Sequence, residues 1–225
     1  MEACVATRGL SKAYGKSEVV SGLNLCVPAG SVYGFLGPNG AGKTTTMKML
    51  LGLIRPSNGS ATVLGKQVIP SNRVLINARV GSLIESPSCY PHLTARENLE
   101  IVRSLRGLPE NAIDEALATV RLERTGTKLV RAFSLGMKQR LGLAAALMGK
   151  PDLLLLDEPT NGLDPAGIQE IRELIRELPV ERGCAVLVSS HLLSEIDQMS
   201  EYVGIISHGK MAWQGPIREL HAQAR

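Results

Sequence analysis

Residues 32–45 have the sequence VYGFLGPNGAGKTT, and this stretch decides the fold expected for the chain. The largely apolar residues 32–36 predict a buried strand, and residues 42–53 predict the helix that follows. Between them, GPNGAGKT at 37–44 fits the pattern G-x-x-x-x-G-K-[ST] in its required strand-to-helix context. A chance match arises in about one chain of this length in a hundred. The stretch therefore predicts an α/β domain with a phosphate-binding loop.

Each residue type in this loop has a chemical use. Glycines let the backbone curl so that successive N–H groups point at phosphate oxygens, and the helix N-terminus adds its positive end. Lys43 is expected to reach the β- and γ-phosphates, and the Thr44 hydroxyl to ligate Mg²⁺. The residues predicted to contact the nucleotide are Gly37, Pro38, Asn39, Gly40, Ala41, Gly42, Lys43, Thr44 and Thr45.

Two further segments end apolar strands with polar side chains. LLLLDEP at 153–159 places Asp157 to hold Mg²⁺ through water and Glu158 to polarise an attacking water. His191 follows CAVLVSS at 184–190 and could hydrogen-bond the γ-phosphate. Open α/β sheets bind ligands at the carboxyl ends of their strands. Taken singly, these side chains could be solvated carboxylates and a structural histidine, but Lys43 favours the functional interpretation.

The rest of the chain suggests how this core is elaborated. Short β-type runs between residues 4 and 36 predict antiparallel strands. Residues 87–148 predict helices. Thr94 to Glu97 form a capping box, and apolar residues follow it at helical spacing: Leu99, Val102 and Leu105. A second helix is expected at 109–122, where Ile113, Leu117 and Val120 share one face. Strand-helix alternation then returns, with a terminal helix at 217–225. We expect one domain, 1–225, with core and β subdomain in 1–86 and 149–225 and an α-helical lobe in 87–148.

The composition of the chain limits which classes of partner are expected. The formal charge of +4 comes without a dense Lys/Arg run, and aromatic residues make up only 3% of the chain, so no nucleic-acid partner is expected. The four cysteines are scattered without a C-x-x-C pair, which favours reduced thiols in a cytoplasmic protein. No apolar run approaches the roughly 18 residues of a spanning helix, and no secretory signal opens the chain. Any membrane role is expected to come through a partner.

With these motifs the chain resembles, over nearly its whole length, the nucleotide-binding subunit of an ATP-binding cassette (ABC) transporter. In that family a stretch usually written LSGGQ begins the helix before the acidic strand, and here it is FSLGM at 133–137. The resemblance implies that Ser134 and Gly136, with Met137 beside them, contact the γ-phosphate of an ATP held by a second copy. Two copies would then enclose two ATP molecules head to tail as a homodimer.

The resemblance assigns further positions and cofactors. Tyr14, in SKAYGK, corresponds to the family's aromatic that stacks on adenine, and His191 matches its switch histidine. Residues 161–164, which end at Asp164, match the segment that crosses the dimer interface. The implied cofactors are ATP and Mg²⁺. The implied fold is the P-loop ABC ATPase, with a mostly parallel RecA-like core sheet, an N-terminal antiparallel β subdomain and an α-helical lobe.

Three positions depart from the family pattern. Leu135 replaces a glycine and Met137 a glutamine in the LSGGQ stretch. Glu85 replaces a glutamine that touches Mg²⁺ or the attacking water, so a third carboxylate near Asp157 and Glu158 would repel them unless the metal compensates. In its I-E-S-P context, Glu85 resembles the branch of cassette exporters that confers immunity to lantibiotics and resistance to bacitracin-like peptides.

The function implied is ATP hydrolysis that drives export of an antimicrobial peptide or hydrophobic drug through separate permease subunits, which bind the cargo, at the cytoplasmic face of a bacterial membrane. One alternative is a cassette that gates or signals without export. A soluble cassette ATPase of translation or DNA repair is a second, although one phosphate loop without sustained heptads speaks against it. A GTPase or small-molecule kinase should show an N-K-x-D base reader or a substrate lid, and neither is found.

Overall fold

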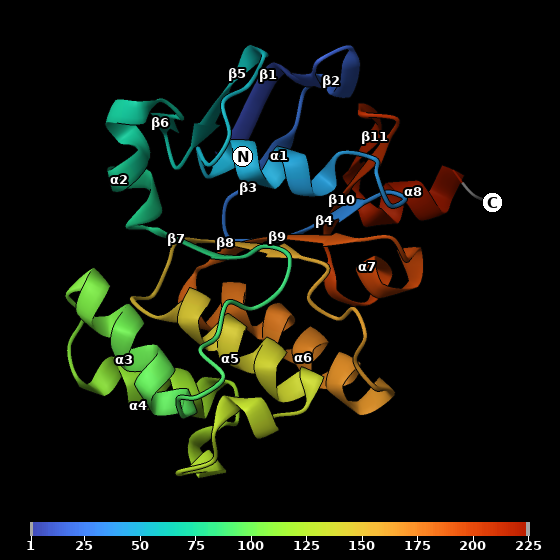
Figure 1. The fold of residues 1–225 in the computed structure, drawn as a ribbon. Helices are drawn as coiled ribbons and strands as arrows, with labels where there is room; N and C mark the ends of the chain where they lie inside the picture. The colour runs from blue at the N-terminus through green and yellow to red at the C-terminus, as the bar shows by residue number, and fades with distance from the viewer. Residues whose placement is uncertain (1, 224–225) are drawn as a thin grey trace.

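A computed structural model describes residues 2–223, and these form two β-sheets with helices between and below them (Figure 1). The first sheet is antiparallel and has the order β2-β1-β5-β6, with β3 also paired to β1. Its strands are β1 (Ala3–Tyr14), β2 (Ser17–Leu23), β3 (Cys26–Pro28), β5 (Asn58–Val63) and β6 (Lys66–Gln67). The predicted antiparallel β subdomain is confirmed.

The second sheet has six strands in the order β11-β10-β4-β9-β8-β7. All neighbours are parallel except β11, which is antiparallel to β10. The strands are β4 (Val32–Leu36), β7 (Val80–Leu83), β8 (Leu153–Asp157), β9 (Ala185–Ser190), β10 (Tyr202–Ser207) and β11 (Lys210–Pro216). Every residue of β8 and β9 is buried, as expected for central parallel strands covered on both faces. The predicted mostly parallel core sheet is confirmed.

Helices cover both faces of this sheet (Figure 1). Helix α1 (Lys43–Leu50) lies between the two sheets, and its side chains share one apolar cluster with β1, β5 and β8. On the opposite face lie α3 (Ala95–Arg106), α4 (Asn111–Thr119), α5 (Leu135–Leu147), α6 (Pro165–Arg182) and α7 (Leu193–Met199). The short α2 (Arg73–Asn77) lies beside β6, and α8 (Ile217–Gln223) packs on β11. Three 3₁₀ turns complete the list: Pro70–Asn72, Glu123–Thr125 and Val130–Ala132.

Residues 87–148 hold α3, α4 and α5, but this segment is not independent of the sheet. Helix α5 packs directly under β7, and its buried side chains belong to the same cluster as β8 and α6. The approach is so close that a Cβ at Gly81 would overlap the carbonyl oxygen of Ala146. The division into a core and a helical lobe therefore stays a prediction, with α5 shared by both.

Several local expectations can be compared with the structure. Thr94 and Glu97 form the predicted capping box of α3, and Leu99 is buried. Leu105 was expected on the same face but is 83% exposed. At about 100° per residue it lies about 120° around the helix from Leu99, outside the buried stripe. The terminal helix extends to Gln223, and residues 224–225 lie outside the described part of the chain.

Within residues 2–223, no helix has both the length and the apolar character that crossing a membrane demands. All four cysteines are free thiols.

Candidate nucleotide-binding site

The loop between β4 and α1 requires glycine at specific positions. Gly42 has a φ of 104°, and a Cβ there would lie 2.9 Å from the carbonyl oxygen of Val19. A Cβ at Gly37 would lie 2.5 Å from the carbonyl oxygen of Ile206. No side chain caps the start of α1, so its first N–H groups stay available to an anion. The sequence thus builds a tight turn that opens onto a helix N-terminus, as the motif predicted.

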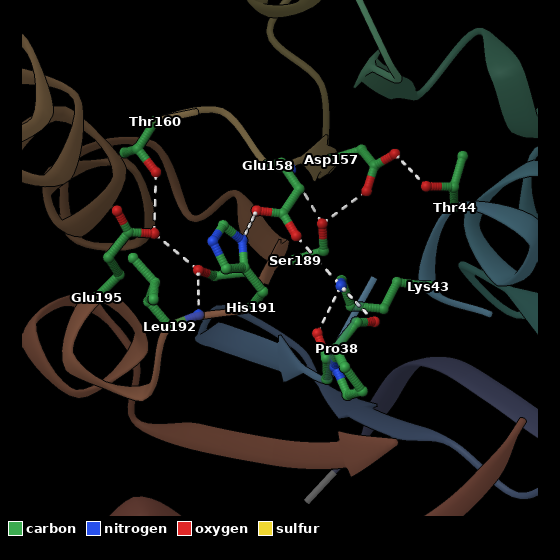
Figure 2. A network of polar contacts seen from close by, with 12 residues as sticks. Pro38, Lys43, Thr44, Asp157, Glu158, Thr160, Ser189, His191, Leu192 and Glu195 are labelled. Carbon is green, nitrogen blue, oxygen red and sulfur yellow. Dashed lines mark hydrogen bonds and ion pairs between the residues drawn. The ribbon is translucent and has the colours of Figure 1, made fainter. Parts of the chain in front are cut away.

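Lys43 is buried at the centre of this turn, with its ammonium group fully partnered (Figure 2). Its Nζ donates to the carbonyl oxygens of Gly37 at 2.6 Å and Pro38 at 3.2 Å. It also forms an ion pair with Glu158 Oε1 at 3.1 Å. A buried ammonium needs such compensation, and Glu158 supplies the negative charge in this structure. The two residues predicted to bind phosphate and activate water are therefore in direct contact.

Thr44 and Asp157 also meet, as the predicted metal site requires. The Thr44 hydroxyl donates to Asp157 Oδ2 at 2.6 Å, and the Ser189 hydroxyl donates to Asp157 Oδ1 at 2.6 Å. Asp157 ends β8, and Ser189 lies directly opposite on the neighbouring parallel strand β9. Oxygen donors of this kind suit Mg²⁺, which is normally held by one or two carboxylates together with substrate phosphates. The side chains present therefore fit the metal that the motif implies.

Glu158 is held by contacts at its backbone and at both carboxylate oxygens. Its φ of 50° is left-handed, an uncommon conformation for this residue type that is concentrated at functional sites. Its backbone N–H donates to Ser189 Oγ at 2.9 Å, and its Oε2 lies 2.8 Å from Nδ1 of His191. The Oε1 atom meets Lys43 at ion-pair distance without hydrogen-bond geometry, so it keeps acceptor capacity although it is buried.

Ser189 is a functional residue that sequence reasoning missed. Its single hydroxyl accepts from Glu158 and donates to Asp157, which fixes both acidic residues at once (Figure 2). The available signal was the strand register: Ser189 belongs to the apolar run that precedes His191, and parallel neighbours end at the same edge.

Glu85 lies in a different arrangement from the one expected. Its carboxylate pairs with Lys48 at 2.6 Å, on the same face of α1 as Thr44 and one turn further along. Glu85 is 62% exposed and has a φ of 63°. In residues 2–223 no three or more His, Cys, Asp or Glu side chains form a group able to hold a metal ion. Within the described residues Glu85 therefore does not form such a group with Asp157 and Glu158, and its metal contact stays a prediction.

The FSLGM turn forms a helix start of its own. Ser134 is the N-cap of α5, and its Oγ accepts from the N–H of Met137 at 3.2 Å. Asp164 caps α6 in the same way by accepting from Gly167 at 3.3 Å. The side chain of Leu135 approaches Gly162, so the two helix starts lie side by side. No hydrogen bond or ion pair of the described residues joins Ser134 to the phosphate loop.

Tyr14 stands apart from the acidic residues. It ends β1 at the hairpin with β2, is 52% exposed, and has Lys12 Nζ 4.9 Å from its ring centroid. An exposed aromatic ring of this kind suits stacking with a base, and the adenine contact of Tyr14 stays a prediction.

A parallel α/β sheet with this phosphate loop, a buried lysine and an acidic strand end defines a P-loop nucleoside triphosphatase. The family model described as "ABC transporter" matches residues 20–161. The chain belongs to the ABC transporter family, and as a member it binds and hydrolyses ATP.

Relatives in that family cover all or most of the chain. It is 49% identical to the bacitracin transport ATP-binding protein BcrA of Bacillus licheniformis over 226 residues, covering all of this chain and 74% of the relative. It is 44% identical to the lantibiotic transport ATP-binding protein SrtF of Streptococcus pyogenes over 204 residues, covering 91% and 87%. Its fold matches cbiO1 of Clostridium perfringens, part of the ABC transporter complex cbiONQ, with a TM-score of 0.88 at 26% identity over 100% and 92% of the two chains. The resemblance to the bacitracin and lantibiotic branch is thereby confirmed.

Proposed function

We propose that this chain is the ATP-hydrolysing subunit of an exporter that removes an antimicrobial peptide, of the bacitracin or lantibiotic type, from a bacterial membrane. The observation that carries the catalytic part is the continuous network from Thr44 through Asp157, Ser189 and Glu158 to His191. The cargo class is supported by relatives named for bacitracin and lantibiotic transport. The relative named for daunorubicin and doxorubicin resistance, DrrA of Streptomyces peucetius, keeps a hydrophobic drug as the second cargo candidate.

The side chains divide the work of hydrolysis. Thr44 and Asp157 would hold Mg²⁺, which would neutralise charge on the phosphates. Lys43 leaves Glu158 to contact the β- and γ-phosphates. The freed Glu158 carboxylate accepts a proton from the attacking water, and His191 orients that carboxylate and contacts the γ-phosphate. Glu85 would be free to contact Mg²⁺ only once its carboxylate had left Lys48.

Two copies complete each site. Ser134, Gly136 and Met137 of one copy contact the γ-phosphate of ATP bound by Lys43 of the other, and Tyr14 stacks on the adenine. Within one chain, α1 and α5 lie on opposite faces of the six-stranded sheet, which supports this arrangement. When ATP arrives, the Ser134 hydroxyl and the start of α5 act as an anion receptor, as helix N-termini do. Asp164 lies on the segment that crosses between the copies.

A cleft beside the Glu85 loop offers a place for the membrane subunit. Its volume is about 290 Å³, and its walls come from the loop after β7, from α3 and from α5. Apolar side chains that line it include Leu53, Ile84, Tyr90, Ile101 and Val102. We place a cytoplasmic segment of the permease here, which puts the chain on the cytoplasmic face of the membrane. Motion of the Glu85 loop then reaches the membrane helices.

Purification of the chain from membranes, together with its permease, tests this function. The complex is reconstituted in vesicles, and ATP hydrolysis and peptide movement are measured with bacitracin and with a lantibiotic, beside a Lys43→Met complex. We expect peptide-stimulated hydrolysis and peptide movement that Lys43→Met abolishes. Stimulated hydrolysis without movement would instead indicate gating or signalling. Failure of any membrane subunit to co-purify would favour a soluble cassette ATPase and contradict the proposal.

A further inference from the structure

Behind the catalytic residues lies a buried carboxylate that the hydrolysis mechanism does not use. Glu195, in the first turn of α7, is only 5% exposed. Its Oε2 accepts from the Thr160 hydroxyl at 3.0 Å and from the Ser190 hydroxyl at 2.7 Å. The Ser190 Oγ in turn accepts from the N–H of Leu192 at 3.0 Å. A single oxygen atom of Glu195 thus joins the loop after β8 to the last residue of β9, where the His191 loop begins, 30 residues further along the sequence (Figure 2).

The two loops that Glu195 joins carry the catalytic residues Glu158 and His191. Thr160 comes two residues after Glu158 and immediately before residues 161–164, whereas Ser190 comes immediately before His191. The Glu158–His191 hydrogen bond joins the same two loops on the side that faces Lys43. Together the two contacts close a ring, with the reacting side chains at one edge and Glu195 at the other.

Burial of a carboxylate is costly, which makes this contact informative. A carboxylate removed from water loses hydration that only hydrogen bonds or charge can replace. The hydroxyls of Thr160 and Ser190 supply hydrogen bonds, and the first turn of α7 favours negative charge. Shorter or apolar side chains would leave both hydroxyls without this acceptor. The length of Glu195 therefore matches the gap between the loops.

We propose that Glu195 is a positioning residue that fixes the loop of Glu158 to the loop of His191. Through Thr160 it also passes movement of residues 161–164, the segment nearest a second copy, to His191. The inference rests on the proposed hydrolysis by Glu158. Glu195 itself does not contact substrate.

Three substitutions separate length from charge at this position. Glu195→Gln keeps a carbonyl oxygen at the same reach, so both hydroxyls retain an acceptor, and we expect kcat within about threefold of the parent. Glu195→Asp keeps the charge but is one methylene shorter, and Glu195→Ala removes the acceptor. For both of these we expect kcat to fall by about tenfold or more while KM for ATP stays within about twofold, because the chemistry depends on placement more than binding does.

A second set of variants tests the path through Thr160. Thr160→Val removes the hydroxyl at nearly constant shape and is expected to lower kcat. Combined with Glu195→Ala it should add nothing further, because both changes break the same contact. Asp197→Asn is the matched control, since this carboxylate lies on the same helix but pairs with His221 at 2.6 Å, and its kcat should equal that of the parent.

Hydrogen exchange of the nucleotide-free chain gives a readout that does not depend on hydrolysis. The amide of Leu192 should exchange about tenfold faster in Glu195→Ala than in the parent, and Glu195→Gln should restore its protection. Unchanged exchange and kcat in folded Glu195→Ala would overturn the inference, as would equal losses in Glu195→Gln and Glu195→Ala. A parent chain that hydrolyses no ATP would instead contradict the proposed function. The exchange of the Leu192 amide would still test whether Glu195 fixes the Glu158 loop to the His191 loop.

Discussion

Glu158 shows how one backbone conformation organises the chemistry. Its left-handed φ of 50° turns the carboxylate away from the line of β8 and toward Lys43 and His191. The Ser189 hydroxyl receives the displaced N–H, so the unusual conformation is stabilised by the strand beside it. Such local strain persists only where neighbouring contacts define it. Ser189 therefore matters to Glu158 as much as to Asp157.

The Lys48–Glu85 pair gives a prediction for metal dependence. Lys48 holds the carboxylate of Glu85 at 2.6 Å, and both groups are partly exposed, so the pair contributes at most about 1 kcal/mol to the free energy of unfolding. If the Glu85 carboxylate contacts Mg²⁺, Lys48→Gln releases that carboxylate from its ion pair and should lower the Mg²⁺ concentration needed for half-maximal hydrolysis. Glu85→Gln should raise that concentration. Titration of ATPase activity with Mg²⁺ measures both, and a shift in the same direction for the two variants would contradict the metal role.

Helix α3 illustrates how a local sequence signal becomes stability. Thr94 accepts from the N–H of Glu97, and the Glu97 carboxylate accepts from the N–H of Thr94 at 2.7 Å. The Thr94 hydroxyl also donates to this carboxylate at 2.8 Å. The hydrogen bonds that the carboxylate accepts, first from the Thr94 backbone and then from its hydroxyl, lower the pKa of Glu97 below its ordinary 4.5. The ionised carboxylate thus fixes the start of α3, which lines the cleft beside the Glu85 loop.

Removal of the cap should therefore have a pH-dependent cost. Thr94→Ala is expected to lower the free energy of unfolding by about 1 kcal/mol at pH 7. Because the pKa of Glu97 is lowered in the folded state, its stabilisation is present above pH 4.5 and is lost as the pH falls through the folded-state value. Urea unfolding of the parent and Glu97→Gln should show a difference at pH 7 that narrows below pH 4.5. A difference independent of pH would contradict this assignment.

The elements found from sequence were those with strong local signals. The phosphate loop, the apolar runs of β8 and β9 and the capping box of α3 each depend on neighbouring residues, so the pattern alone locates them. Strand β7 and helix α2 were missed because each is only four or five residues long. Leu105 was misplaced because i+3 spacing drifts around the helix.

The site residues differ in the same way: those with a strong local signal were predicted, and those set by three-dimensional contacts were missed. Lys43, Thr44, Asp157 and Glu158 follow from a motif and a strand end. Ser189 and Glu195 were not predicted, since Asp157 and Thr160, their partners across the site, lie more than 30 residues away and depend on the register of β8 with β9 and on the packing of α7. Lys48 was likewise invisible as the partner of Glu85, because the pairing is set in three dimensions.

In the molecule as a whole, the phosphate loop, the FSLGM turn and the cleft beside the Glu85 loop are three separate features. The phosphate loop opens at the carboxyl edge of the six-stranded sheet, whereas the FSLGM turn begins α5 on the opposite side of the acidic strand. The cleft beside the Glu85 loop forms a third feature, lined by Cys89 among others. This layout suits a chain that closes on a second copy and meets a membrane subunit elsewhere.

Alkylation of the four cysteines tests whether the permease binds in the cleft beside the Glu85 loop. Cys26 is exposed, whereas burial raises the pKa of the Cys4 thiol to about 11 and that of Cys184 to about 12, and also raises that of Cys89. Thiolates are the reactive form, so Cys26 should be alkylated first and Cys89 more slowly, at a rate that rises with pH. In the complex with the permease, Cys89 should be protected while Cys26 still reacts. Mass spectrometry measures how much of each cysteine is alkylated. Equal labelling of Cys89 with and without permease would exclude the cleft as the permease-binding site.

The solution mass of Glu158→Gln with ATP and Mg²⁺, beside that of the double variant Glu158→Gln, Ser134→Arg, tests most directly whether two copies share each ATP. Glu158→Gln should bind ATP without hydrolysing it and have twice the mass of one chain. The double variant should bind ATP and stay monomeric, because an arginine in place of the N-cap blocks the turn that receives the γ-phosphate. A double variant that dimerises like Glu158→Gln, or a Glu158→Gln chain that stays monomeric with ATP bound, would contradict the shared site.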